Sequence, residues 1–183
     1  MLQLGKWLGC SIDPVLLQCF LETDKPARFI SLLRFKTDQA MLDQRASGIL
    51  LHPTSLPGPY GIGDLGNAAY AFVDFLVRSG QQRWQILPLG PTGFGDSPYA
   101  CFSSFAGNPL LISLDRLVAS GDLDASDLQL EQPFSETHVD YGAVIAWKLP
   151  LLRKAAGKFL KSAVAFRQAA FQKFCQEEAG WLD

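Results

Sequence analysis

The strongest constraint on the fold is the stretch from Gly48 to Pro109, where short apolar runs alternate with loops rich in glycine and proline. Gly48 to Leu51 is an apolar run typical of a buried parallel strand. The next loop, His52 to Gly61, contains three prolines, which restrict φ and lack an N–H donor. We therefore expect a shaped loop directly after a buried strand.

A helix and a second strand complete this pattern. Apolar residues at helical spacing predict a helix from Asn67 to about Ser79, ended by Gly80, and Trp84 to Leu89 is the next apolar run. A second loop, rich in aromatic and small polar residues, follows from Gly90 to Pro109. The order strand, loop, helix, strand is that of a β–α–β unit, whose parallel strands place functional loops at their carboxyl ends. The predicted fold class is α/β.

The rest of the chain is expected to be mainly helical. Leu110 to Leu114 is predicted to be extended, Asp115 to Ser120 a helical turn, and Asp122 to Thr137 an irregular acidic excursion. Ala143 to Ala156 is apolar enough to form a packed helix, kinked or split at Pro150. Apolar residues at intervals of three or four then predict one further helical face, formed by Phe159, Ala163, Phe166, Ala170 and Phe174.

Charge and cysteine content narrow the classes of partner. With 16 basic and 18 acidic side chains, a net charge of -2 and no dense run of either sign, the chain is not expected to bind nucleic acid or a membrane surface. No segment approaches the roughly 20 apolar residues of a membrane span. The four cysteines have no spacing typical of a metal site or a disulfide framework, which favours reduced thiols in the cytoplasm: Cys10, Cys19, Cys101 and Cys175.

Residues 1–44 differ from the rest of the chain, since they are Leu-rich, carry scattered charges and contain only short apolar runs. They lack the long apolar core of a secretory signal and are too acidic for an organelle transit peptide. We expect residues 1–44 to be an N-terminal extension, and our hypothesis is that Met41 is the natural start and that the forty residues before it are not part of the functional unit.

A dinucleotide-binding fingerprint is present from Gly61 to Gly66, directly before the predicted helix. That mechanism needs the glycines immediately after the first strand and an acidic residue at the end of the second. Here a long loop separates Leu51 from Gly61, and the second strand ends in Leu89 and Gly90. The context therefore argues against nucleotide binding.

Three polar residues in or next to the two loops are candidates for binding or catalysis. His52 lies just past a strand end, where it can serve binding or catalysis, or simply bond to loop backbone. Asp64 fits best as an acid near a helix N-terminus. Asp96 either closes an Asx-type turn or bonds sugar hydroxyls. Neither carboxylate has the setting expected of a nucleophile.

Aromatic residues cluster around the two loops, and aromatic faces can stack on sugar rings. The set comprises Tyr60, Trp84, Phe94, Tyr99, Phe102 and Phe105. A core role is expected for Trp84 and Phe105. Phe94 and Tyr99, surrounded by glycine, proline and aspartate on a turn, are better candidates for a binding surface.

These segments closely resemble the amylomaltase or disproportionating-enzyme family, the 4-α-glucanotransferases. The resemblance is carried by GILLHPTSLPGPYGIGDLG at 48–66, WQILPLGPTG at 84–93, GDSPY at 95–99, SFAGNP at 104–109 and VDYG at 139–142. It covers residues 45–183. Runs of this length in this order are specific to the family, and residues 1–44 have no counterpart in it.

The resemblance implies the N-terminal, incomplete part of an α-amylase-like (β/α)8 barrel with a helical insertion. The family transfers a segment of an α-1,4-glucan, such as a maltooligosaccharide, starch or glycogen, to a 4-hydroxyl of another sugar with retention. It implies no metal or organic cofactor. Tyr99, Asp96 and Ser97, with His52, resemble part of the donor-binding cleft, and Phe94 with Tyr141 resembles a secondary glucan-stacking site.

The family's catalytic carboxylates lie on later barrel strands, so the resemblance implies that the nucleophile and the acid/base are expected beyond Asp183. We therefore expect the 183-residue chain to be inactive alone. Two of eight strands cannot close a barrel, which predicts open edges and poor solubility. The alternative from a different class is a non-catalytic carbohydrate-binding module that uses Phe94, Tyr99 and Tyr141.

Overall fold

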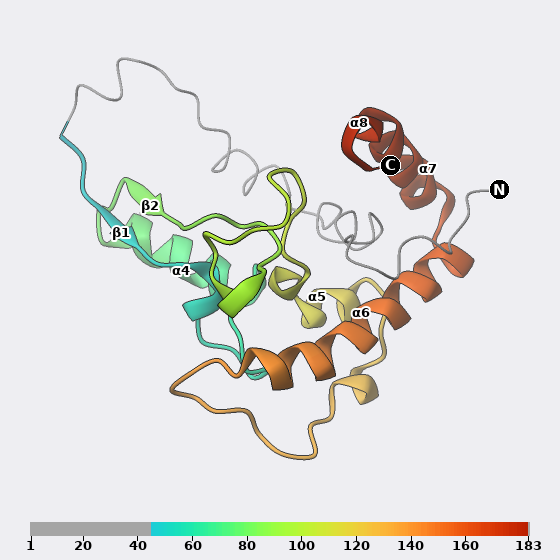
Figure 1. Ribbon diagram of the computed structural model, residues 1–183, viewed down its shortest axis with the longest axis horizontal. Coiled ribbons are helices and arrows are strands. Elements are labelled where there is room, and N and C mark those ends of the chain that lie inside the picture. The colour runs from blue at the N-terminus through green and yellow to red at the C-terminus, as the bar shows by residue number, and fades with distance from the viewer. Residues whose placement is uncertain (1–44, 183) are drawn as a thin grey trace.

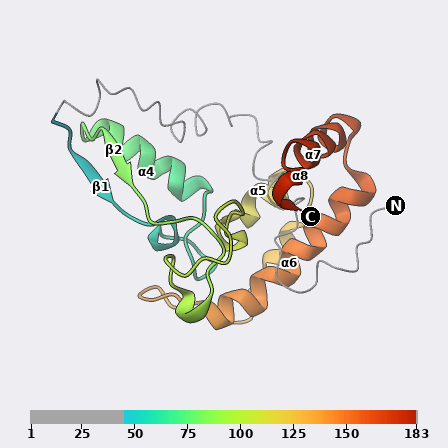
Figure 2. The ribbon, with the colours of Figure 1, turned by 45° about the horizontal axis from the view of Figure 1, so that its top comes forward.

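The computed structural model describes residues 45–182. The extension proposed for residues 1–44 and the hypothesis about Met41 lie outside these described residues. A short β–α–β unit lies at one end of the molecule and two helices, α7 (Ala165–Glu177) and α8 (Ala179–Leu182), at the other (Figures 1 and 2). The long helix α6 (Tyr141–Ser162) runs between them.

The α/β unit predicted at the start of the described chain is confirmed. Strands β1 (Gly48–Leu50) and β2 (Arg83–Gln85) are parallel, with Ile49 opposite Trp84, and α4 (Asn67–Arg78) connects them. Both strands are shorter than predicted. The last ladder bond runs from Leu51 N to Gln85 O at 3.0 Å, and beyond it Pro53 and Pro88 have no N–H to donate.

The prediction that these strands are buried on both faces is wrong for the described chain. Leu50 is 57% exposed, and Ile49 and Trp84 are only half-buried. The reason is that the sheet has two strands in the described chain and one of its faces is covered by α4. Phe72 of α4 meets Trp84 edge to face, with ring centroids 5.0 Å apart, while the opposite face stays open.

The segment predicted to be extended after the second loop is instead a 3-10 turn, η4 (Pro109–Leu111). Asn108 caps it, because its side-chain oxygen accepts a hydrogen bond from Leu110 N at 2.9 Å, and Pro109 supplies a φ suited to the first helical position. The short helix α5 (Leu114–Ala119) comes next, as predicted. Local capping by an Asn-Pro pair therefore overrides the apolar run that suggested a strand.

Helix α6 is not split at Pro150. Pro150 and Ala146, whose carbonyl loses its helical partner, are both exposed, so water can satisfy that carbonyl. The stripe predicted to continue on one helical face is wrong, because Ala163 and Val164 are extended and separate α6 from α7. Phe159 is consequently buried in the core, whereas Phe166 is 69% exposed.

The main core joins α5 and α6. Leu114, Leu117, Leu152, Ala155 and Phe159 are nearly or fully buried together. Smaller apolar clusters lie under α4 and at the start of α6. The helical part of the described chain is therefore built around α6, and the loops of the β–α–β unit rest on its N-terminal half.

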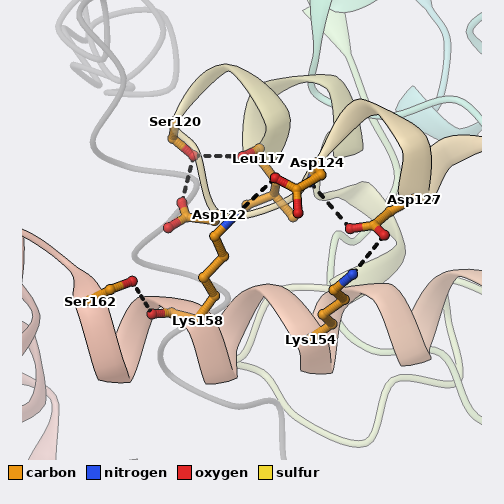
Figure 3. Close-up of polar contacts among 8 residues, drawn as sticks. All are labelled: Leu117, Ser120, Asp122, Asp124, Asp127, Lys154, Lys158 and Ser162. Carbon is orange, nitrogen blue, oxygen red and sulfur yellow. Dashed lines mark hydrogen bonds and ion pairs between the residues drawn. The ribbon is translucent and has the colours of Figure 1, made fainter.

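The acidic excursion between α5 and α6 is more ordered than the sequence suggests. It contains the 3-10 turn η5 (Ala125–Leu128), closed by a capping box of Asp124 and Asp127. Figure 3 shows Lys154 and Lys158 reaching from α6 to Asp127 and Asp124, at 2.6 and 3.1 Å. These two ion pairs therefore hold the excursion against α6. No described helix is long and apolar enough to cross a membrane.

Candidate functional site

The first loop holds His52 in a bonded position at its beginning. The His52 Nδ1 atom lies 2.7 Å from the Thr54 hydroxyl and 3.4 Å from Thr54 N, and its Nε2 lies 3.4 Å from the carbonyl oxygen of Pro88. A tautomer with hydrogen on Nε2 satisfies all three contacts. Half-burial lowers the pKa of the ring, so the imidazole is neutral near pH 7. The backbone-bonded interpretation of His52 is therefore observed, with Nε2 held only by a long bond.

The second loop folds back on itself and presents its tip outward. Gly93 N bonds to Ala100 O at 2.8 Å, and Thr92 and Cys101 form an antiparallel bridge. Between them lies the 3-10 turn η3 (Phe94–Asp96). The tip is therefore a short hairpin-like projection whose base is tied by backbone hydrogen bonds.

The aromatic side chains at this tip are free of the core. Phe94 is 96% exposed and Tyr99 is 75% exposed. Aromatic rings with so little contact contribute nothing to folding through burial, so their presence on a tied projection points to a role in binding. The exposure of both rings agrees with the expectation from the sequence, and their role in binding stays a prediction.

Asp96 is held in an uncommon backbone conformation. Its φ is 52°, a region that aspartate tolerates better than most residues but that still carries strain. Within the described chain its carboxylate makes no hydrogen bond, so the Asx-type turn is not formed; the neighbouring Ser97 hydroxyl instead accepts from Tyr99 N at 3.3 Å. The Asp96 carboxylate is therefore available to a ligand.

The remaining loop aromatics divide between packing and exposure. Trp84 packs on α4 and donates from Nε1 to Leu51 O at 2.7 Å. The core role expected for Phe105 is wrong, since Phe105 is 72% exposed and stacks on Trp181 of α8 at 6.2 Å between centroids. A phenylalanine in an irregular loop beside two serines has no periodicity from which its environment could be read.

The structure brings some of the predicted site residues together. Both views place the turn η3 beside the N-terminal end of α6, the helix that begins with Tyr141 (Figures 1 and 2). Tyr141 is half-buried and packs on the Ile62, Leu110 and Val144 cluster. In the described chain His52 forms no hydrogen bond or ion pair with the tip residues, and it connects to the second loop only through Pro88.

The backbone donors of the glycine fingerprint bond within the protein, since Gly63 N donates to Thr54 O and Gly66 N to the Asp64 carboxylate. A Cβ at Gly61 would collide with the Phe134 ring, one at Gly63 with the carbonyls of Pro53 and Leu56, and one at Gly66 with Ser113. These glycines are thus needed for close packing against the protein itself. No group of three metal-ligating side chains occurs within residues 45–182 either.

Comparisons with known proteins decide the family. The family model described as 4-α-glucanotransferase matches residues 51–183. The chain belongs to this family. Similar relatives include the 4-α-glucanotransferases of a Synechocystis species, 53% identical over 142 residues, and of Thermus thermophilus, 51% identical over 140 residues.

The match covers most of this chain and little of its relatives. The alignments include 78% and 76% of this glucanotransferase-family chain but only 28% and 27% of those two relatives. A structure of the amylomaltase from Streptococcus agalactiae in complex with acarbose matches with a TM-score of 0.67 and 48% identity, covering 74% of this chain and 27% of that one. The chain therefore spans about a quarter of the length of these family members.

Sequence reasoning missed a group of polar residues behind the loops of this family member. Lys148 of α6 is fully buried and donates to Leu110 O at 2.7 Å, and Asp64 accepts from Gly66 N at 2.8 Å and from the Ser113 hydroxyl. Burial raises the pKa of Asp64 and lowers the pKa of Lys148 to about 8. The signal available in the sequence was a lysine among the apolar residues of a predicted packed helix.

Proposed function

We propose that this chain forms one wall of the glucan-binding cleft of a 4-α-glucanotransferase, an enzyme that moves a segment of an α-1,4-glucan to the 4-hydroxyl of another sugar with retention. The observation that carries the proposal is the exposed tip of the second loop. There Phe94 and Tyr99 offer ring faces to solvent, and the Asp96 carboxylate has no hydrogen-bond partner in the described chain. Family membership supplies the class of ligand.

The tip has the chemistry that a glucan requires. Sugar rings present apolar C–H faces, which stack on aromatic rings, and rims of hydroxyls, which bond to carboxylates and hydroxyl groups. We assign Tyr99, Asp96 and Ser97 to the donor side of the cleft. His52 joins them as a neutral donor, because its 3.4 Å bond to Pro88 is long enough to be exchanged for a sugar hydroxyl.

Phe94 and Tyr141 are assigned to a secondary glucan site. The turn that carries Phe94 lies beside the first turn of α6, which Tyr141 opens (Figure 1). Phe94 provides a stacking face without a hydroxyl. The S. agalactiae amylomaltase binds acarbose, which supports a carbohydrate ligand for a chain of this similarity.

We further propose that the β–α–β unit is the beginning of an α-amylase-like (β/α)8 barrel and that the helices from α5 onward form an insertion. Retaining glycoside chemistry needs two carboxylates about 5 Å apart on either side of the bond. Asp64 and Asp96 are the acids of the two loops, and Asp64 is engaged by Gly66 and Ser113. We therefore expect this chain to bind glucan without turning it over.

A cytoplasmic location of this chain stays a prediction.

The test is calorimetric titration of the purified chain with maltoheptaose. We expect binding that weakens by about tenfold in Phe94→Ala and in Tyr99→Ala, since each removes one stacking face. The matched control is Phe166→Ala, which truncates another exposed phenylalanine on α7 and should leave affinity unchanged. Equal loss in all three variants, or no binding by the wild-type chain, would refute the proposed binding wall.

Catalytic competence is tested separately by incubating the chain with maltotriose and separating the products. We expect neither glucose nor longer maltodextrins. Formation of both would show that the chain carries its own catalytic carboxylates. Binding without turnover is also the result expected of a carbohydrate-binding module. Activity that appears when the part of a relative not aligned with this chain is co-expressed would favour the barrel wall over that alternative.

A further inference from the structure

A buried lysine lies behind both loops. Lys148, in the middle of α6, has no exposed surface, and its Nζ donates to the carbonyl oxygen of Leu110 at 2.7 Å. The charge of Lys148 is attracted by the carboxylates of Asp64 and Asp115. An ammonium is costly to bury, so a fully buried one requires hydrogen bonds and counter-charges of this kind.

The partners of Lys148 lie where the two loops end. Asp64 closes the first loop just before α4, and Leu110 lies directly after the second loop. The same junction is tied by backbone, because Leu65 N bonds to Leu111 O at 2.9 Å. The Lys148 side chain therefore bonds to the segment after the second loop, and its charge attracts Asp64 after the first loop.

The third segment at this junction is α6 itself. Tyr141 opens α6, and Lys148 comes two turns later on the side that faces Leu110. Asp115 at the start of α5 completes the polar group, and it also accepts from the Tyr60 hydroxyl at 2.6 Å. Lys148 thus belongs to the helix that Tyr141 opens, bonds to the segment after the second loop, and is attracted by carboxylates on two further segments.

We propose that Lys148 is a positioning residue of the glucan site, whose buried ammonium sets the two binding loops and the start of α6 relative to one another. The expected effect of Lys148 on glucan affinity rests on the proposed function, but its effect on the placement of the loops can be tested without any sugar. Lys148 is suited to this task because its Nζ bonds to a carbonyl on one segment while its charge attracts carboxylates on two others.

The first test measures hydrogen–deuterium exchange in Lys148→Met, a variant of similar length without charge. We expect the amides at the loop ends, Leu65, Asn108 and Leu111, to exchange about tenfold faster, because openings of the junction no longer break the Lys148 contacts. Amides in α4 should change much less. The matched control is Lys154→Met, which removes an exposed ion pair on the same helix and should leave the loop ends unchanged.

Uniform acceleration across α4 and the loops, or no acceleration at the loop ends, would overturn the proposal. If Lys148→Met fails to fold because Asp64 loses its counter-charge, the double variant Asp64→Asn/Lys148→Met removes that charge as well. Rapid exchange confined to the loop ends of the double variant would support positioning through the Leu110 carbonyl. Exchange of those amides in the double variant at the rate of the wild-type chain would contradict the proposal.

A pH series on the wild-type chain gives a second readout that a purely apolar packing role would not move. The buried ammonium has its pKa lowered to about 8 by burial, against attraction from Asp64 and Asp115. An opening that exposes Lys148 restores its ordinary pKa, so opening becomes less favourable as pH rises above about 8. In the wild-type chain, the protection factors of the loop-end amides should rise by several-fold over the next pH unit. In Lys148→Met, the same protection factors should not change with pH.

The sugar measurement separates this proposal from the proposed function. In Lys148→Met we expect maltoheptaose affinity to fall by about tenfold with unchanged helical content, because the loops lose their relative placement. Altered exchange with no glucan binding even by the wild-type chain would remove the proposed function and keep Lys148 as the tie of the loops. Normal exchange with normal affinity in Lys148→Met would remove the positioning role alone.

Discussion

At the scale of single residues, close packing decides which glycines are indispensable. Gly63 lies where a Cβ would collide with the carbonyl oxygens of Pro53 and Leu56. Gly157, inside α6, has no atom within 4 Å of an added Cβ. The same amino acid is therefore required by tertiary contact at one position and is only a weak helix former at the other.

Two alanine substitutions test this contrast. Gly63→Ala should lower the free energy of unfolding by roughly 1 to 3 kcal/mol, because backbone must move to admit the methyl group. Gly157→Ala should raise it by about 0.5 to 1 kcal/mol through improved helix propensity. Urea denaturation followed by circular dichroism measures both, and similar effects of the two substitutions would show that the close approach at Gly63 is not required.

At the scale of elements, α7 is attached to the core by a buried ion pair in addition to Phe171, which meets Phe159 edge to face. Arg167 donates from both terminal nitrogens to the two carboxylate oxygens of Asp122, at 3.0 and 2.7 Å, and stacks its guanidinium over Phe159 at 4.9 Å. Only 13% and 5% of the two side chains are exposed. The pairs that Lys154 and Lys158 form along α6 are much more exposed (Figure 3).

Burial predicts unequal costs for breaking these pairs. Asp122→Ala leaves the Arg167 charge in a poorly hydrated site and should cost about 3 to 5 kcal/mol. Asp124→Ala breaks the more exposed pair with Lys158 and should cost at most about 1 kcal/mol. Urea denaturation of the two variants measures these costs. Equal losses of unfolding free energy would mean that burial does not strengthen the Asp122 pair.

At the scale of the whole molecule, the buried Lys148 makes stability depend on pH. Its pKa is lowered from 10.5 to about 8 in the folded chain, so between these values the unfolded chain holds the proton more tightly than the folded chain. The unfolding free energy should therefore rise with pH across this window, by at most roughly 3 kcal/mol. Above pH 10 the raised pKa of Tyr60 acts in the opposite direction.

Urea unfolding of the wild-type chain and of Lys148→Met at several pH values measures this dependence. The rise between about pH 8 and 10 should be present in the wild-type chain and absent from the variant, because only the wild-type chain has this ammonium. Parallel curves for the two proteins would assign the pH dependence to other groups.

The surface formed by residues 45–182 predicts self-association. Large apolar side chains are exposed in the second loop, in β1 and near α7, among them Phe102, Phe105, Leu50, Val164 and Phe166. We expect concentration-dependent association in sedimentation velocity, reduced by the double variant Val164→Ser/Phe166→Ser because it shrinks one apolar patch. Monomeric behaviour of the wild-type chain at high concentration would contradict the poor solubility expected of it.

The sequence by itself determined the β–α–β order, the helix from Asn67, the loop tip with Phe94 and Tyr99, and the family. These features depend on residues close together in the chain: turn residues that restrict the backbone, apolar periodicity, and long ordered motifs. The exposure of the strands was outside its reach, since burial of a strand depends on what covers its faces.

Only the tertiary structure decided how these parts are held. The exposure of Phe105, the continuity of α6 through Pro150 and the break after Ser162 depend on which surfaces meet solvent and which meet a neighbour. Lys148 is the clearest case, because its partners Asp64 and Leu110 are far from it in sequence and adjacent only in the fold. Local patterns specify elements, whereas the position of a buried charge is set by contacts between elements that no local pattern contains.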